Sequence, residues 1–219
     1  MKCMAEKIYA QKQITDAYHD LGELFIRFLD VSTGYVLHTH PKLLFGQKRL
    51  YKYYEQSAKE LTKTLNFYAA DGDGDREAVD ISLFVYEKRL KEIGVNLKEI
   101  DAEILKEFDS KLVGTSWSKA DRKKTRSRAE FLKTVDLPAK TYHAAALWYL
   151  HEEYGLSSGR LPEIYRIFRR LYYSFCELYI NGTVYGDEAC RKTTQYYTKE
   201  LEKIGILFHE INFIKNKGV

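Results

Sequence analysis

The sequence has few of the residues that interrupt or crosslink a chain. Its 219 residues include only three prolines, 13 glycines and three cysteines. So few prolines and glycines favour long helices over the many short strands and turns of a sandwich or barrel. Cys3, Cys176 and Cys190 are far apart and form no Cys-x-x-Cys pair. We therefore expect neither a disulfide framework nor a zinc site, and we expect a reducing cytoplasm as the location.

Long apolar runs are also missing. No window approaches 18 apolar residues without a charge, so the sequence predicts no membrane-spanning segment and no membrane partner. The charged first seven residues are not followed by an apolar run, which is not the pattern of a secretion signal. The apolar content of 45% is ordinary for a globular protein, and the chain is long enough to bury a core.

The signatures of common catalytic and metal sites are absent too. The sequence contains no phosphate-binding loop, dinucleotide fingerprint or nucleophile elbow. His151 precedes two glutamates but lacks the second histidine of a zinc-protease motif, and we expect its imidazole to hydrogen-bond across the loop that follows. Asp71, Asp73 and Asp75 have the spacing that opens a calcium-binding loop. The sixth position of that loop would be Arg76 instead of glycine, and the twelfth would be Ser82 instead of glutamate. We predict no cofactor, no metal and no enzymatic activity; an enzyme would depend on His151.

What the sequence does contain is an internal repeat. When Arg49 is placed over Arg160, 52 positions align without a gap at an offset of 111, and 13 pairs are identical. About three identities would be expected by chance. When two residues are skipped upstream, His38 also lies over His151. The alignment predicts a fold duplicated in tandem.

Apolar residues at three- and four-residue steps predict helices in both copies. In the first copy we expect a helix over 14–29 that Ser32-Thr33-Gly34 interrupts, a long helix from Arg49 to Tyr68, and a third helix that Gly94 caps.

The second copy repeats this order. We expect a helix over 144–154, a long helix from Leu161 to Tyr179, and a last helix that Gly205 caps. The predicted fold is all-α, with about eight helices in two pseudo-symmetric repeats that pack as one body. Repeat 1 covers residues 1–100, a basic connector covers 101–137, and repeat 2 covers 138–219.

Positive charge is concentrated in the connector. Residues 117–133 carry seven cations against two acids, a net charge of +5, whereas the whole chain carries +4. The cations are Lys119, Arg122, Lys123, Lys124, Arg126, Arg128 and Lys133. They could contact phosphates or an acidic protein surface, and Trp117 could stack on a base. A solvated linker helix is the alternative, and the sequence leaves both open.

The long helix of the second copy offers four more candidates for the same surface. Arg166, Arg169, Arg170 and Tyr173 are predicted to lie opposite its apolar stripe, where they would extend the basic patch.

One stretch resembles a known family. The string Ala-Ala-Leu-Trp-Tyr-Leu-His-Glu-Glu-Tyr-Gly over 145–155, then Gly159-Arg160-Leu161 and the closing Ile204-Gly205-Ile206, resembles a family of short uncharacterised helical proteins of phages and prophages. The resemblance covers residues 144–206 and, more faintly, 35–95, where Tyr35 replaces the Trp. The family brings no biochemical role, so the resemblance implies a phage origin rather than a mechanism.

Phage accessory genes often encode small non-enzymatic inhibitors of host defence. The resemblance and the basic segment therefore predict a non-catalytic protein in the host cytoplasm that binds and inhibits a nucleoprotein defence complex, as anti-CRISPR proteins do. Direct binding of DNA or RNA through residues 117–133 is the alternative. The identity of the partner, the oligomeric state and the separate roles of the two copies are not specified by the sequence.

Overall fold

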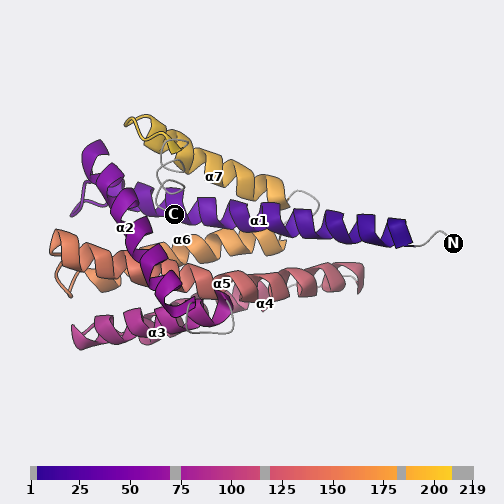
Figure 1. Ribbon diagram of the computed structural model, residues 1–219, viewed down its shortest axis with the longest axis horizontal. Coiled ribbons are helices and arrows are strands. Elements are labelled where there is room, and N and C mark those ends of the chain that lie inside the picture. The colour runs from indigo at the N-terminus through magenta and orange to yellow at the C-terminus, as the bar shows by residue number, and fades with distance from the viewer. Residues whose placement is uncertain (1–3, 70–74, 114–118, 182–185, 209–219) are drawn as a thin grey trace.

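The computed structural model describes the backbone of residues 4–69, 75–113, 119–181 and 186–208, and the side chains of residues 22–67, 77–108, 135–179 and 188–208. Within these ranges the chain forms seven helices and no strand (Figure 1). The helices are α1 (Met4–Thr39), α2 (Gln47–Ala69), α3 (Asp75–Glu92), α4 (Leu97–Val113), α5 (Lys119–Tyr154), α6 (Leu161–Asn181) and α7 (Gly186–Glu202). The predicted all-α fold is confirmed. None of the described helices combines the length and apolar character needed to cross a membrane.

Helices α1–α3, here called the first half, and α5–α7, the second half, have matching lengths. Helices α1 and α5 each contain 36 residues, α2 and α6 contain 23 and 21, and α3 and α7 contain 18 and 17. Gly94 and Gly205 follow α3 and α7 with φ values of +87° and +81°. This left-handed conformation suits glycine, so both predicted glycine caps are confirmed.

The two halves interlock. Helix α3 packs against α5 of the second half, and α7 packs against α1 of the first, as Figure 1 shows above and below the centre of the bundle. Helix α1 also contacts α6, and α2 contacts α5. Each half therefore covers the first helix of the other with its own third helix. The buried side chains of both halves form one continuous core.

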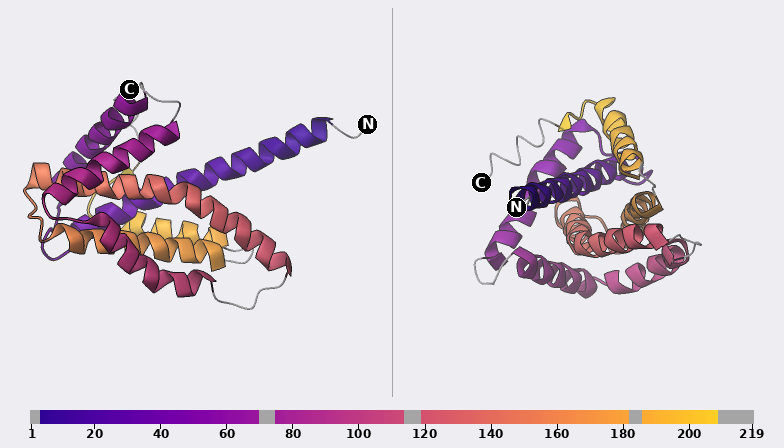
Figure 2. Two further views of the ribbon diagram at one scale, coloured as in Figure 1. Left: turned by 90° about the horizontal axis from the view of Figure 1, so that it is seen from below. Right: turned by 90° about the vertical axis from the view of Figure 1, so that its right-hand side faces the viewer.

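The expected connector does not form a separate element. Its residues 101–113 belong to α4, which packs along α6, and residues 119–137 are the first half of α5. Helix α5 continues without a break through residue 137, so the expected start of repeat 2 does not coincide with a helix end. Figure 2 places the beginnings of α1 and α5 at the same end of the molecule, splayed apart.

The expected interruption at Ser32-Thr33-Gly34 is wrong, because α1 is continuous from Met4 to Thr39. Gly34 has a packing role instead: a Cβ atom there would collide with the hydroxyl of Tyr54. That hydroxyl donates to the carbonyl of Asp30 over 2.8 Å. A glycine inside a helix costs about 1 kcal/mol relative to alanine. Here the missing side chain lets a ring of α2 lie directly against α1.

Candidate functional site

The side chains of the basic segment lie outside the described part of the structure. Trp117 precedes the described start of α5, and the cations from Lys119 to Lys133 are known only by their place on its helical backbone. The structure therefore places these residues on the first four turns of a long helix. It does not test their predicted contacts.

Two of the four additional candidates form ion pairs with helix α4. Arg166 Nη2 lies 3.0 Å from Glu103 Oε2, and Arg170 Nη2 lies 2.8 Å from Glu107 Oε1. The hydrogen bonds that Arg170 donates to Glu107 raise the pKa of Arg170. Both pairs are exposed, and exposed ion pairs typically stabilise a protein by less than about 1 kcal/mol. They orient α4 along α6 and leave these arginines already paired.

The other two candidates are not on the surface. Arg169 is completely buried and Tyr173 is 7% exposed, so their predicted position opposite the apolar stripe is wrong. Arg169 Nε lies 2.9 Å from Asp101 Oδ1, its Nη2 lies 2.7 Å from Asp136 Oδ1, and Nη2 also donates to the Tyr173 hydroxyl. The spacing in the sequence was consistent with burial, because Arg169 follows the apolar-stripe residue Tyr165 by four positions and precedes Tyr172 by three.

The buried arginine is part of a charge-balanced network. Lys140 Nζ lies 3.2 Å from Asp136 and 3.7 Å from Asp101, so two cations face two carboxylates. Burial raises the pKa of Asp136, but the charges of Arg169 and Lys140 outweigh it and hold this pKa below its usual value. The guanidinium also lies 4.9 Å from the ring centre of Tyr172. The network joins α4, α5 and α6.

His143 lies beside this network in the core. Its ring stacks on Phe168 at 5.3 Å and is almost fully buried. Burial lowers the pKa of His143 well below 6.5, and the nearby Arg169 lowers it further. The imidazole is therefore neutral at pH 7.

The paired histidines have a structural role. His38 Nδ1 lies 2.9 Å from the carbonyl oxygen of Phe45, and His151 Nδ1 lies 2.8 Å from that of Leu156. The first bond spans seven residues and the second five, which matches the two skipped residues of the alignment. The predicted hydrogen bond of His151 across its loop is confirmed. Within the described residues, no three potential ligands gather around a possible metal position.

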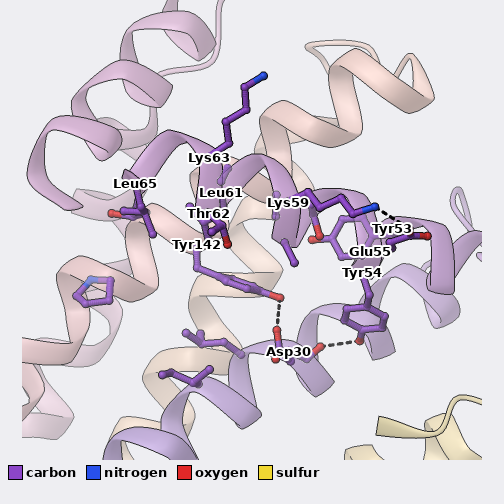
Figure 3. A pocket seen from close by; sticks show the side chains of 18 of the residues that line it. Asp30, Tyr53, Tyr54, Glu55, Lys59, Leu61, Thr62, Lys63, Leu65 and Tyr142 are labelled. Carbon is purple, nitrogen blue, oxygen red and sulfur yellow. Dashed lines mark hydrogen bonds and ion pairs between the residues drawn. The ribbon is translucent and has the colours of Figure 1, made fainter. Parts of the chain in front are cut away.

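A cavity of about 550 Å³ lies beneath α2, and the sequence did not indicate it (Figure 3). Helices α1, α2, α3 and α5 line it. Its floor consists of the buried Tyr53, Tyr54, Asp30 and Ala146, and the exposed Ile26 lies at its mouth. This size is within the range of pockets that bind small molecules, about 300–1,000 Å³.

The lining of the cavity is mainly apolar, with polar groups at its floor and along its rim. Tyr142 donates to Asp30 Oδ1 over 2.8 Å, as drawn in Figure 3. Burial and the Asp30 charge raise the pKa of Tyr142 well above 10, so its hydroxyl remains a donor. The Tyr53 hydroxyl is buried near Ser57 but makes no hydrogen bond of good geometry. At the rim, Lys59 pairs with Glu55 over 2.8 Å.

An alignment of the two halves shows which side chains differ around the cavity. At the offset of 111, Ser57, Ala58 and Leu61 of α2 correspond to Phe168, Arg169 and Tyr172 of α6. At the offset that aligns His38 with His151, Pro138 and Thr141 of α5 correspond to Phe25 and Phe28 of α1. The larger residue of each pair is buried around α6, where Phe28 of α1 stacks on Phe175 at 3.9 Å. Smaller side chains at the same positions leave the space beneath α2 empty.

Comparison with protein-family models, with curated proteins and with solved structures finds no match for this chain.

Proposed function

We propose that the protein is a non-catalytic phage-type accessory protein that binds a host nucleoprotein defence complex and inhibits it, in the manner of an anti-CRISPR protein. The contact surface would be the basic first half of α5, with Trp117 before it. This segment would meet an acidic surface of the complex, either nucleic acid or protein that normally holds nucleic acid.

A charge comparison between two helices of equal length carries the proposal. Residues 119–133 of α5 carry seven cations and two acids, whereas the corresponding residues 6–20 of α1 carry two cations and three acids. The fold therefore accommodates a nearly neutral sequence at this place in the helix. Because the basic charge is not needed to form the helix, it is better explained by a partner.

The contacts of the α6 arginines also favour α5 as the contact surface. Arg166 and Arg170 are already paired with glutamates of α4, and Arg169 is buried. Among the candidates for the basic patch, the cations that remain for an external acidic partner are those of α5. We accordingly assign the contact to residues 117–133 alone and remove the α6 residues from it.

We also infer that the two halves descend from one duplicated unit. The matched helix lengths, the twin histidine bonds and the reciprocal packing of α3 on α5 and α7 on α1 support this. In this interpretation only the second copy acquired the basic helix.

The test is capture of the partner from lysates of hosts that carry nucleoprotein defence systems. We expect a stoichiometric nucleoprotein complex whose nuclease activity falls when the protein is added. A variant with Arg122, Lys123, Lys124 and Arg126 changed to Gln should lose capture and inhibition together. A control with the exposed Lys48, Lys52, Lys88 and Lys91 changed to Gln removes the same charge elsewhere and should keep both. The absence of a stoichiometric complex from every such host would refute the proposal.

Direct DNA or RNA binding by the same segment is the second candidate. It predicts that the isolated protein binds labelled nucleic acid, with an affinity that falls steeply as salt increases. Fluorescence anisotropy with duplex DNA, single-stranded DNA and RNA at low and physiological salt distinguishes the two. Tight binding that the four-residue variant abolishes supports direct binding, whereas no binding at low salt leaves a protein surface as the partner.

A further inference from the structure

We propose that the cavity beneath α2 binds an aromatic molecule that carries a positively charged amine or amidine, with the ring between α2 and α5 and the cation directed at Asp30. This site is separate from the basic half of α5 and does not depend on the function proposed above.

The second half indicates what the cavity lacks. In the corresponding space it holds the ring of Phe168, the phenol of Tyr172 and the guanidinium of Arg169, all buried. The first half has a serine, a leucine and an alanine at these positions. A molecule that combines a flat ring with a cation would replace these missing groups.

Asp30 supplies the charge for the cationic end. Its carboxylate is at the floor of the cavity, in a residue that is 5% exposed, and Tyr142 holds one of its oxygens. A carboxylate has about four acceptor positions, so it can receive a ligand N–H in addition to its protein partners. At the position aligned with Asp30 the second half has His143, whose neighbour is the Arg169 cation. The first half therefore has an acid where the second half places a neutral ring beside a cation.

The aromatic end of the ligand is indicated by the walls. Tyr53, Tyr54 and Tyr142 present three rings to the cavity, and aliphatic side chains such as Leu29 and Leu61 complete the lining. Tyrosine faces attract both aromatic edges and cations. The buried hydroxyl of Tyr53 offers a further hydrogen-bonding group to a ligand.

The lysines at the mouth do not favour an anion over a cation. Lys59 is neutralised by Glu55, and Figure 3 shows Lys63 extending away from the cavity. A carboxylate ligand would also have to approach the carboxylate of Asp30, and such like charges repel strongly in a buried site.

The probe is benzamidine, added to the full-length protein and followed by calorimetry and by amide NMR shifts. We expect the melting temperature to rise by about 3 °C at about ten times its Kd, and the shifts to map to residues 53–66 of α2. Benzamide has the same shape without the charge and should bind at least about tenfold more weakly, because it loses a charge-assisted hydrogen bond. Benzoate should not bind.

Two variants test the site from different sides. Asp30→Asn should weaken benzamidine binding at least about tenfold. Ser57→Phe, which introduces the ring of the second half, should abolish binding while the protein stays folded. Glu99→Gln removes an exposed acid of α4 and should leave binding unchanged. The proposal is overturned if benzamide or benzoate binds as tightly as benzamidine, or if binding survives either of the first two substitutions.

Discussion

The two halves share a backbone plan but differ in what lies beneath their second helix. Below α6 the space is filled by Phe168, Tyr172 and the paired Arg169, and α4 covers the outside. Below α2 the corresponding side chains are small, and a cavity of about 550 Å³ remains. The halves share their glycine caps, their histidine hydrogen bonds and the packing of their helices, and these features determine the backbone arrangement. The side chains beneath the second helix differ, so an ion-pair network fills this place in one half and a cavity lies there in the other.

The largest expected effect is on the filled side. Arg169→Ala removes a fully buried cation from two partly buried carboxylates, which keep Lys140 and the Tyr165 hydroxyl as partners. This should lower the free energy of unfolding by about 3–5 kcal/mol. Urea denaturation measures this. Arg170→Ala removes a neighbouring but exposed ion pair and should cost less than about 1 kcal/mol. Equal losses from the two substitutions would mean that the buried network does not stabilise the second half.

The contact between α1 and α2 is the next in size. Gly34→Ala puts a methyl group against the Tyr54 hydroxyl, and the strain should cost about 1–3 kcal/mol. Gly22→Ala in the same helix meets no neighbouring atom and should stabilise the protein by up to about 1 kcal/mol. Thermal unfolding of both variants checks the difference. A stable Gly34→Ala protein would show that α2 is free to move outward.

His143 gives the halves different responses to acid, since the first half has Asp30 at the aligned position. The folded protein keeps His143 neutral, whereas the unfolded chain takes up a proton as the pH falls below 6.5. Stability should therefore fall by about 1.4 kcal/mol per pH unit from pH 6.5 down to the folded-state pKa. The stabilisation from Asp136 is lost only below pH 3.8, because its folded pKa is lowered.

The measurement is urea denaturation of the wild type and of His143→Gln from about two pH units below the ordinary imidazole pKa to about one unit above it. The other histidines are common to both proteins and cancel in the difference. The variant should show the shallower decline towards low pH. Parallel curves would mean that His143 is protonated in the folded state.

The smallest effect tests what the halves share. His38→Ala and His151→Ala each remove one hydrogen bond to a loop carbonyl and should each cost about 0.5–1.5 kcal/mol. Equal values from chemical denaturation would support a common structural role. A much larger loss at either position would show that the two loops differ in their contribution to stability as well as in length.

The sequence predicted the helical frame well because that frame depends on local signals. Helical periodicity located α2, α3, α6 and α7, and the glycines that end two of them have positive φ as expected. The failure at Gly34 has a different origin. The need for a glycine at this helical position comes from Tyr54, a residue 20 positions away on another helix, and no local pattern reveals that contact.

The candidate site was harder to predict for the same reason. Arg169 was assigned to the surface because its partners Asp101 and Asp136 are 68 and 33 residues away. The cavity has no motif at all, since it arises from side chains that are smaller than their counterparts. The repeat alignment contained this information, but it becomes meaningful only when the structure shows that α2 and α6 occupy corresponding places.

In this fold the third helix of each half packs on the first helix of the other half. A protein made of one half alone would leave its first helix uncovered, and two such molecules could cover each other as a symmetric swapped dimer. In a homodimer every substitution occurs twice, so a buried arginine at one site forces a buried arginine at the other. Under the duplication proposed above, joining the two copies in one polypeptide removed this constraint. Ala58 can then face a cavity while Arg169 closes its counterpart.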